Sequence, residues 1–307
     1  MVFHPPVAIC AKAGDAGKYK VGLPAWNMLL RGFMSGAYIA MGGALATVCS
    51  TGIQFTTKAT DTMTAAQTMA AAQALVPNVA NGFASAGVAQ LILGAVFPVG
   101  LIITVLTGAE LFTGDAMLAP MAAFIHKISW AQVLQLWVLV YIGNFIGSVV
   151  WAYIMANGPF VTWDSAGVAT ATAFGTRAIA IMGAKTGYVG MMGMYSAFLK
   201  GIGCNWLVNL AILLGICADD LIGKFFGIWF PIMAFVSMGL EHSVANMYFI
   251  PAGIMTAGLT NTATTVTWVN MWMSNLIPVT LGNIVGGMFF VGVIYWVAFK
   301  KEIAALK

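Results

Sequence analysis

Two short polar segments interrupt long apolar stretches of this 307-residue chain, and both carry groups that could handle charge or protons. The first, 107–115, contains Glu110, and the second, 239–243, contains Glu241 followed by His242. Of three histidines, His242 is the one that falls deep within an apolar stretch, and imidazole is the side chain whose ordinary pKa lies nearest to neutrality. We therefore expect His242 to donate protons or to gate a path, and a hydrogen-bonded core histidine is the alternative.

Glu110 and Glu241 occupy the same place in the two segments, which a single kink would not predict. The half-helix ends at two such breaks would direct backbone N–H groups at a common centre, which favours an anion. Two bare carboxylates would repel that anion, so we interpret Glu110 and Glu241 as groups that cap backbone or pair with cations. The alternative for each segment is a Pro/Gly kink with a polar pair buried against neighbouring helices. The four cysteines lack a metal-binding spacing, and a haem would need a second buried histidine, so we expect no cofactor and no metal.

The composition restricts the class of protein. Only 7% of the residues are charged and 61% are hydrophobic, with a mean hydropathy of +0.92. A soluble domain has roughly 25% charged residues, so the chain is predicted to be an integral membrane protein. This excludes a water-soluble enzyme and a nucleic-acid binder. No set of residues indicates covalent chemistry, so we expect no enzymatic activity.

The length of the apolar stretches predicts the fold. A helix needs about 20 residues to cross the hydrocarbon layer, and irregular backbone at that depth survives only where protein or water satisfies it. The chain is therefore predicted to be an all-α membrane protein with six transmembrane helices, of which the second and fifth are broken. Their ranges are 26–50, 86–123, 130–156, 189–217, 223–255 and 270–299.

Two longer connectors separate these spans: 52–85, expected to hold a short interfacial helix and a loop, and 157–185. The remaining pieces are an N-terminal segment, 1–25, and a tail, 300–307, which flank the membrane domain 26–299. Nine basic residues lie on the side of the termini and three on the other, so the positive-inside rule places both termini in the cytoplasm. The predicted location is the plasma membrane.

The same landmarks occur twice in the same order, three spans apart. Because each half has an odd number of crossings, the second half must be inverted relative to the first, which is typical of transport proteins with a site near the bilayer midplane. The repeats are expected at about 26–156 and 189–299. The matching pairs are Arg31-Gly32 and Lys200-Gly201, Phe97-Pro98 and Phe230-Pro231, Gly108-Ala109-Glu110 and Gly239-Leu240-Glu241, and Gly143-Asn144 and Gly282-Asn283.

Several strings within these landmarks resemble the formate/nitrite transporter family, in particular its formate-channel branch in archaea and bacteria. The resemblance extends from the segment 5–25, which matches an amphipathic helix of the family, through the sixth span. The most specific string is Glu241-His242-Ser243-Val244-Ala245-Asn246-Met247 in the broken fifth helix. The others are Gly100-Leu101, Glu110-Leu111-Phe112-Thr113-Gly114, Gly201-Ile202-Gly203-Cys204-Asn205-Trp206-Leu207-Val208 and Gly282-Asn283.

This resemblance implies pentamers of aquaporin-like protomers, each with its own pore and a central histidine, here His242. Two hydrophobic constrictions are implied on either side of it. The first matches Phe97, Leu101 and Phe235, and the second matches Leu111, Phe112 and Val208. The loop of Glu110, Leu111, Phe112 and Thr113 is implied to gate together with the N-terminal helix, and Asn205, Glu241 and Asn246 to line or support the pore.

The family's pore-approach lysine has an imperfect match. Its usual position corresponds to Val189, and the candidate Lys185 lies four residues earlier, which is one helical turn. A long side chain can still reach the vestibule from there. Lys185 is therefore expected to attract the anion.

The resemblance implies a membrane channel or transporter for formate or a similar small monovalent anion, with proton transfer at His242. Nitrite, hydrosulfide or short-chain carboxylates are alternative substrates within the family. An alternative of another class is a membrane-anchor subunit of a formate-oxidising complex, and a neutral-solute channel would need Asn-Pro-Ala at both breaks, which is absent. The implied partners are the small anion, protons, lipid and identical subunits, without nucleic acid.

Overall fold

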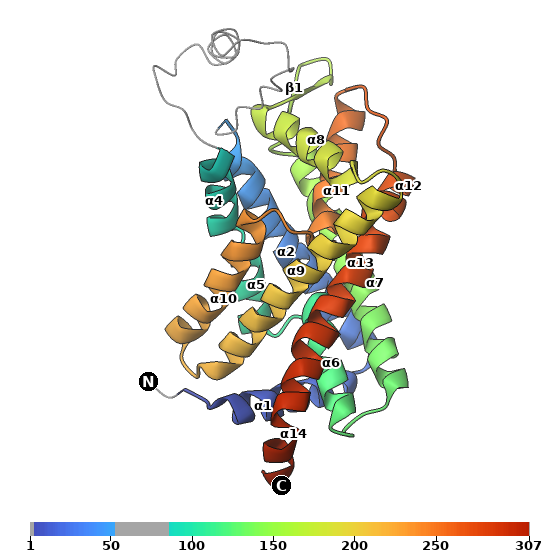
Figure 1. Ribbon diagram of the computed structural model, residues 1–307. Coiled ribbons are helices and arrows are strands. Elements are labelled where there is room, and N and C mark those ends of the chain that lie inside the picture. The colour runs from blue at the N-terminus through green and yellow to red at the C-terminus, as the bar shows by residue number, and fades with distance from the viewer. Residues whose placement is uncertain (1–2, 53–85, 307) are drawn as a thin grey trace.

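The computed structural model describes residues 3–52 and 86–306 (Figure 1). The helix and loop expected at 52–85 therefore lie outside the described residues, apart from Gly52. The first half consists of α1 (Pro6–Val21), α2 (Ala25–Ser50), α4 (Ala86–Val96), α5 (Val99–Thr107), α6 (Phe112–Phe124) and α7 (Trp130–Asn157). The second half consists of α8 (Ala173–Thr186), α9 (Gly190–Cys217), α10 (Leu221–Ser237), α11 (Ser243–Leu259), α12 (Trp268–Asn270), η1 (Met271–Leu276), α13 (Ile277–Ile284), η2 (Val285–Val293) and α14 (Ile294–Ala305).

The helices agree closely with the six predicted spans. Within the described chain, five helical stretches are long and apolar enough to cross a membrane, and α10 is a shorter apolar helix of 17 residues. The predicted second span consists of α4, α5 and α6, and the fifth of α10 and α11. The sixth is one continuous helix, 268–305, that includes two π-helical stretches, η1 and η2.

The connector at 157–185 has its own structure. Its first part is an antiparallel hairpin of β1 (Val161–Trp163) and β2 (Ala169–Ala171), in which Thr162 pairs with Thr170. Its second part is α8, whose N-cap Thr172 accepts a hydrogen bond from the backbone N–H of Gly175. The hairpin and α8 lie at the opposite end of the molecule from both termini (Figure 1).

The two broken helices run in opposite directions, as an inverted repeat requires. In Figure 1 the first runs from α4 at the top to α6 at the bottom, and the second from α10 at the bottom to α11 at the top. One landmark differs between the halves. At Pro98 the helix ends and restarts, whereas α10 continues through Pro231. Proline removes a backbone donor at both positions, but the helix is interrupted only at Pro98.

Small residues bring the paired helices of each half into backbone contact. A β-carbon on Gly36 of α2 would lie 2.1 Å from the carbonyl oxygen of Asn144 on α7. A β-carbon on Gly282 of α13 would lie 2.2 Å from the carbonyl oxygen of Phe198 on α9. Close approach of this kind is how membrane helices gain van der Waals packing without a hydrophobic driving force.

The N-terminal helix α1 lies across the end of the molecule that holds both termini (Figure 1). Its buried residues recur every three or four positions and form one face: Cys10, Ala13, Gly14 and Gly17. The preceding residues are attached to the end of α9, where the backbone N–H of His4 donates to Cys217 O at 2.9 Å. The His4 ring lies 2.7 Å from Asp219 Oδ1, and this hydrogen bond lowers the pKa of the Asp219 carboxyl.

We expect Gly282→Ala to destabilise the protein by about 1–3 kcal/mol, because the added methyl group must push two helix backbones apart. Gly183→Ala is the matched control. Gly183 is exposed in the middle of α8, and an added β-carbon would meet no atom within 4 Å, so alanine should be neutral or stabilising there. The midpoint of thermal unfolding in detergent measures both. Equal midpoints for the two variants would contradict this packing.

Candidate functional site

Each broken helix is interrupted at a glycine with a left-handed backbone. Gly108 has φ of +73° and Gly239 has φ of +68°, a region that residues with a β-carbon rarely adopt. The chain then becomes extended before the next helix begins. Leu111, before α6, has φ, ψ of −115°, 118°, and His242, before α11, has −111°, 115°. Leu111 and His242 therefore occupy equivalent positions in the two repeats.

One buried asparagine closes the first break. The side-chain amide of Asn144 donates to Gly32 O at 2.8 Å and to Glu110 O at 2.9 Å. Its oxygen accepts from the first N–H of α6, that of Phe112, at 3.0 Å. A single side chain thus satisfies backbone groups of α2, of the break and of the new helix, where water cannot reach them.

Asn283 closes the second break with the same three contacts. Its amide donates to Gly201 O at 2.8 Å and to Glu241 O at 3.0 Å, and its oxygen accepts from the N–H of Ser243 at 2.9 Å. The first N–H of each half-helix is therefore already bonded to an amide. Any attraction of an anion by these half-helix ends comes from the remaining N–H groups and from the helix dipole.

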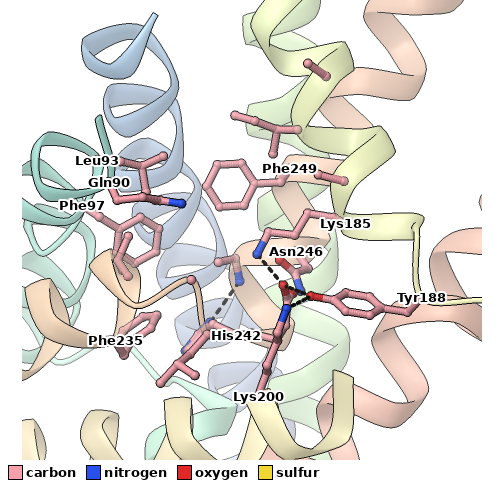
Figure 2. Close-up of a pocket in the computed structure, with 18 of the residues that line it drawn as sticks. Gln90, Leu93, Phe97, Lys185, Tyr188, Lys200, Phe235, His242, Asn246 and Phe249 are labelled. Atoms are coloured by element: carbon pink, nitrogen blue, oxygen red, sulfur yellow. Dashed lines mark hydrogen bonds and ion pairs between the residues drawn. The ribbon is translucent and has the colours of Figure 1, made fainter. Parts of the chain in front are cut away.

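The carboxylate of Glu241 is buried and receives four side-chain donors. Oε1 accepts from Lys185 Nζ and from Tyr188 OH, both at 2.8 Å. Oε2 accepts from the amides of Asn246 at 2.6 Å and Asn275 at 3.3 Å. Figure 2 shows Lys185, Tyr188 and Asn246 pointing toward this common centre. Glu241 thereby links α8, the break, α11 and η1 (Met271–Leu276).

Glu110 has a matching set of partners in the first repeat. Lys20 of α1 donates to Glu110 Oε2 and lies 2.9 Å from Asp115 Oδ1. Arg31 Nη1 lies 3.7 Å from Glu110 Oε1, and Arg31 Nη2 donates to Tyr19 OH at 3.2 Å. In the second repeat Lys200 Nζ donates to Tyr188 OH at 3.0 Å in the same manner.

The two clusters differ at one position that changes charge. Five residues after Glu110 stands Asp115, and five residues after Glu241 stands Asn246. Asp115 is fully buried, and its Oδ2 has no hydrogen-bond partner among the described residues. Lys20 therefore forms ion pairs with two buried carboxylates, whereas Lys185 forms an ion pair with one.

The ring of His242 lies between the two breaks. Nδ1 accepts from the N–H of Ala245 at 3.0 Å, so His242 caps its own half-helix. Nε2 lies 2.9 Å from Thr113 Oγ1, which belongs to the first repeat. Because Nδ1 is an acceptor, we assign the hydrogen of the neutral ring to Nε2, facing Thr113. The ring stacks on Phe235 with centroids 5.8 Å apart.

A cavity of about 310 Å³ leads to His242 from the end of the molecule that holds α8. Phe97, Phe235 and Phe249 give it an aromatic lining, and His242 is labelled at its inner end in Figure 2. Glu241 is the only carboxylate among the described lining residues. Its cationic lining residues are Arg177, Lys185 and Lys200.

The residues expected to form constrictions are all buried. Phe97 and Phe235 pack edge to face with centroids 5.9 Å apart at the cavity wall, and Leu101 lies one turn after Phe97 in α5. Leu111 and Val208, expected in the second constriction, are 3% and 1% exposed.

The structure places Phe112 against α7. Its ring contacts Tyr141 edge to face at 4.9 Å between centroids and Trp137 at 6.1 Å. Its neighbour Thr113 is fixed by its backbone, because Asn205 and Asn209 of α9 each donate to Thr113 O at 3.0 Å. The segment expected to gate is therefore hydrogen-bonded on both faces in this conformation.

Several contributing residues were not identified from the sequence. Tyr188, Lys20 and Asp115 complete the two clusters, and Asn209 and Asn275 are the additional buried amides. A signal for one of them, Tyr188, was present: Tyr188 precedes Lys200 by 12 residues, just as Tyr19 precedes Arg31 by 12 residues in the first repeat. Among the described residues no group of three His, Cys, Asp or Glu side chains could hold a metal ion.

Residues 7–297 match the sequence profile of a family described as formate/nitrite transporter. The chain is 39% identical over 306 residues to a probable formate transporter of Methanothermobacter thermautotrophicus, covering 98% of each chain. It is 33% identical over 311 residues to the formate channel BtFdhC of Bacillus thuringiensis, covering each in full.

A solved structure described as a pentameric formate channel with formate bound has a similar fold. Its TM-score is 0.67 at 30% identity, with 90% of this chain and 98% of that chain covered. The prediction of an all-helical membrane protein with several apolar spans is thus confirmed.

We expect Lys20→Met to destabilise the protein by about 3–5 kcal/mol, because it leaves the buried Asp115 without a cation and leaves Glu110 with Arg31 alone, at 3.7 Å. Adding Asp115→Asn should recover part of that loss, because it removes one of the two charges and copies the arrangement at Asn246. Thermal unfolding in detergent provides the comparison. If Asp115→Asn gave no recovery in the Lys20→Met background, the two residues would not act as one ion-pair cluster.

Proposed function

Because the chain belongs to the formate/nitrite transporter family, we propose that it conducts formate, or a closely related small monovalent anion, across the cell membrane together with a proton. Membership confirms the family predicted from the Glu241–Met247 string. The chain is accordingly a multi-pass membrane transport protein and not an enzyme. The main support for this proposal is the cavity, whose described lining includes three cations and, at its inner end, the imidazole of His242.

Formate as the substrate is supported by the relatives, which are described as formate transporters and formate channels. Fivefold assembly is supported by the pentameric structure of similar fold, and each protomer would then hold its own path beside His242. Both termini lie at the end where α1 carries Lys12, Lys18 and Lys20, which supports a cytoplasmic location for that end.

The energy of burying charge favours passage as the neutral acid. A bare carboxylate in an apolar slit faces a desolvation cost of order tens of kcal/mol. Protonating a carboxylic acid with a pKa near 3.7 at pH 7 costs about 4.5 kcal/mol. Protonation is therefore the less costly way past the aromatic wall of Phe97 and Phe235, provided that a proton donor stands beside the path.

His242 is proposed as that donor, acting through Nε2. A permanently cationic ring would place a second N–H against the N–H of Ala245 and lose the helix cap, which argues against a fixed positive charge. The protonated ring is instead transient: Nδ1 takes up a proton from water as it releases Ala245, and Nε2 gives its hydrogen to the anion. The resting ring is restored when Nδ1 returns its proton to water and Nε2 takes up another, so that one proton passes from water to each anion. Losing an N-cap bond of this kind costs about 0.5–2 kcal/mol, which is compatible with turnover.

A panel of solutes in proteoliposomes tests the substrate. We expect formate to enter fastest, nitrite and hydrosulfide to enter more slowly, and glycerol to be excluded. Entry of glycerol would indicate a neutral-solute channel. Absence of flux for every solute would support the alternative of an assembly or anchor subunit and contradict the proposal.

Replacing His242 by asparagine should lower formate uptake at least tenfold. Asparagine can retain an N–H donor toward Thr113 and can cap the half-helix, but it cannot exchange a proton. Uptake of labelled formate and acidification of the vesicle lumen are measured together. Loss of proton uptake with an undiminished formate current would show that the bare anion passes without the histidine and would refute the relay.

A further inference from the structure

The three cations of the cavity differ in how they are neutralised. Lys185 forms an ion pair with Glu241 at 2.8 Å, and Lys200 donates to Tyr188 OH, which in turn donates to Glu241. Arg177 makes no hydrogen bond or ion pair with any residue of 3–52 or 86–306, and its Nε is buried without a partner. Among the described lining residues, its guanidinium is thus the cation with neither a hydrogen bond nor an ion pair.

Arg177 stands on the face of α8 that lines the cavity. The lining residues of this helix, 177, 180, 181, 184 and 185, recur at helical spacing. Arg177 precedes Lys185 by eight residues, which is about 12 Å along the helix axis. Lys185 is the one paired with Glu241, next to His242, so Arg177 lies farther from His242 along α8, toward the end of the molecule that holds the hairpin.

An unpaired guanidinium in a partly buried site favours an anionic partner. Burial lowers the pKa of Arg177 from its ordinary value, but arginine remains protonated in proteins. The lining residues that the structure describes include three cations and one carboxylate, so their net charge is positive. Such a cavity raises the local concentration of anions and speeds their entry.

We propose that Arg177 is the capture site for the substrate at the mouth of the cavity. Its planar fork binds two oxygens of one anion through parallel N–H···O bonds. Lys185 then serves mainly to neutralise and position Glu241. This inference rests on the proposed function and extends it, because it identifies the residue that first holds the anion.

The geometry also selects a class of anion. A guanidinium fork matches planar anions with two equivalent oxygens, such as formate, nitrite and acetate. Hydrosulfide and chloride each have a single acceptor atom and cannot accept two parallel N–H bonds on two separate atoms. A lysine at the same position would supply charge without the fork. The preference for two-oxygen anions over hydrosulfide should therefore depend on arginine and not on charge alone.

Transport variants test this site. We expect Arg177→Gln to raise the formate concentration for half-maximal uptake about tenfold, with a maximal rate close to that of the wild type. Arg177→Lys should restore hydrosulfide uptake fully and formate uptake only in part. The control is Lys301→Gln, which removes one positive charge from the exposed C-terminal end of the molecule and should leave uptake unchanged. An Arg177→Gln variant with the half-saturation of the wild type would overturn the proposal.

A binding measurement separates this inference from the proposed function. The midpoint of thermal unfolding is followed against added formate and nitrite for the wild type, Arg177→Gln and Lys301→Gln. Stabilisation of the wild type and of Lys301→Gln, but not of Arg177→Gln, supports the capture site even if formate is not the transported solute. Equal stabilisation of all three, or stabilisation of none, overturns it, whereas failure of transport by the wild type alone would count against the proposed function only.

Discussion

The constraint on which the rest of the structure depends is that backbone interrupted at membrane depth must find partners inside the protein. Each unsatisfied group there costs several kcal/mol, so a broken helix survives only if other side chains take the place of water. Asn144 and Asn283 meet this requirement with identical sets of three bonds. The cation and carboxylate clusters then fix the broken segments to α1 in one half and to α8 in the other. A rigid frame of this kind can hold one imidazole at a defined place.

The residues to which we assign the function stand where the two halves differ. The frame places Leu111 and His242 at equivalent sites, so one break presents an apolar side chain and the other a titratable ring. Asp115 and Asn246 differ by one charge, which leaves the cluster on the α8 side the more positive. On the proposed path, an anion would thus meet the cations of the α8 side before it reaches the histidine. The asymmetry supports a path in which charge is removed near the centre.

Much of the fold and part of the site could be predicted from the sequence, for physical reasons that differ by residue. The spans follow from hydropathy, and the breaks follow from glycine beside glutamate, since both are local signals. Two partners of Glu241 are not local: Tyr188 lies in the loop between α8 and α9 and Asn275 lies in η1, and both meet Glu241 only after packing. Pro98 and Pro231 share a motif, yet only the first interrupts a helix, because neighbouring contacts decide how a proline is accommodated. Phe112 contacts α7, an orientation that its sequence neighbours do not specify.

The account holds that each anion crosses with one proton, so that no net charge moves. The direct measurement is formate flux into proteoliposomes under two separate driving forces, a pH gradient at zero membrane potential and a membrane potential at zero pH gradient. The account predicts that the pH gradient drives formate accumulation and that the membrane potential alone drives none. Formate accumulation that follows the membrane potential, and ignores the pH gradient, would contradict it.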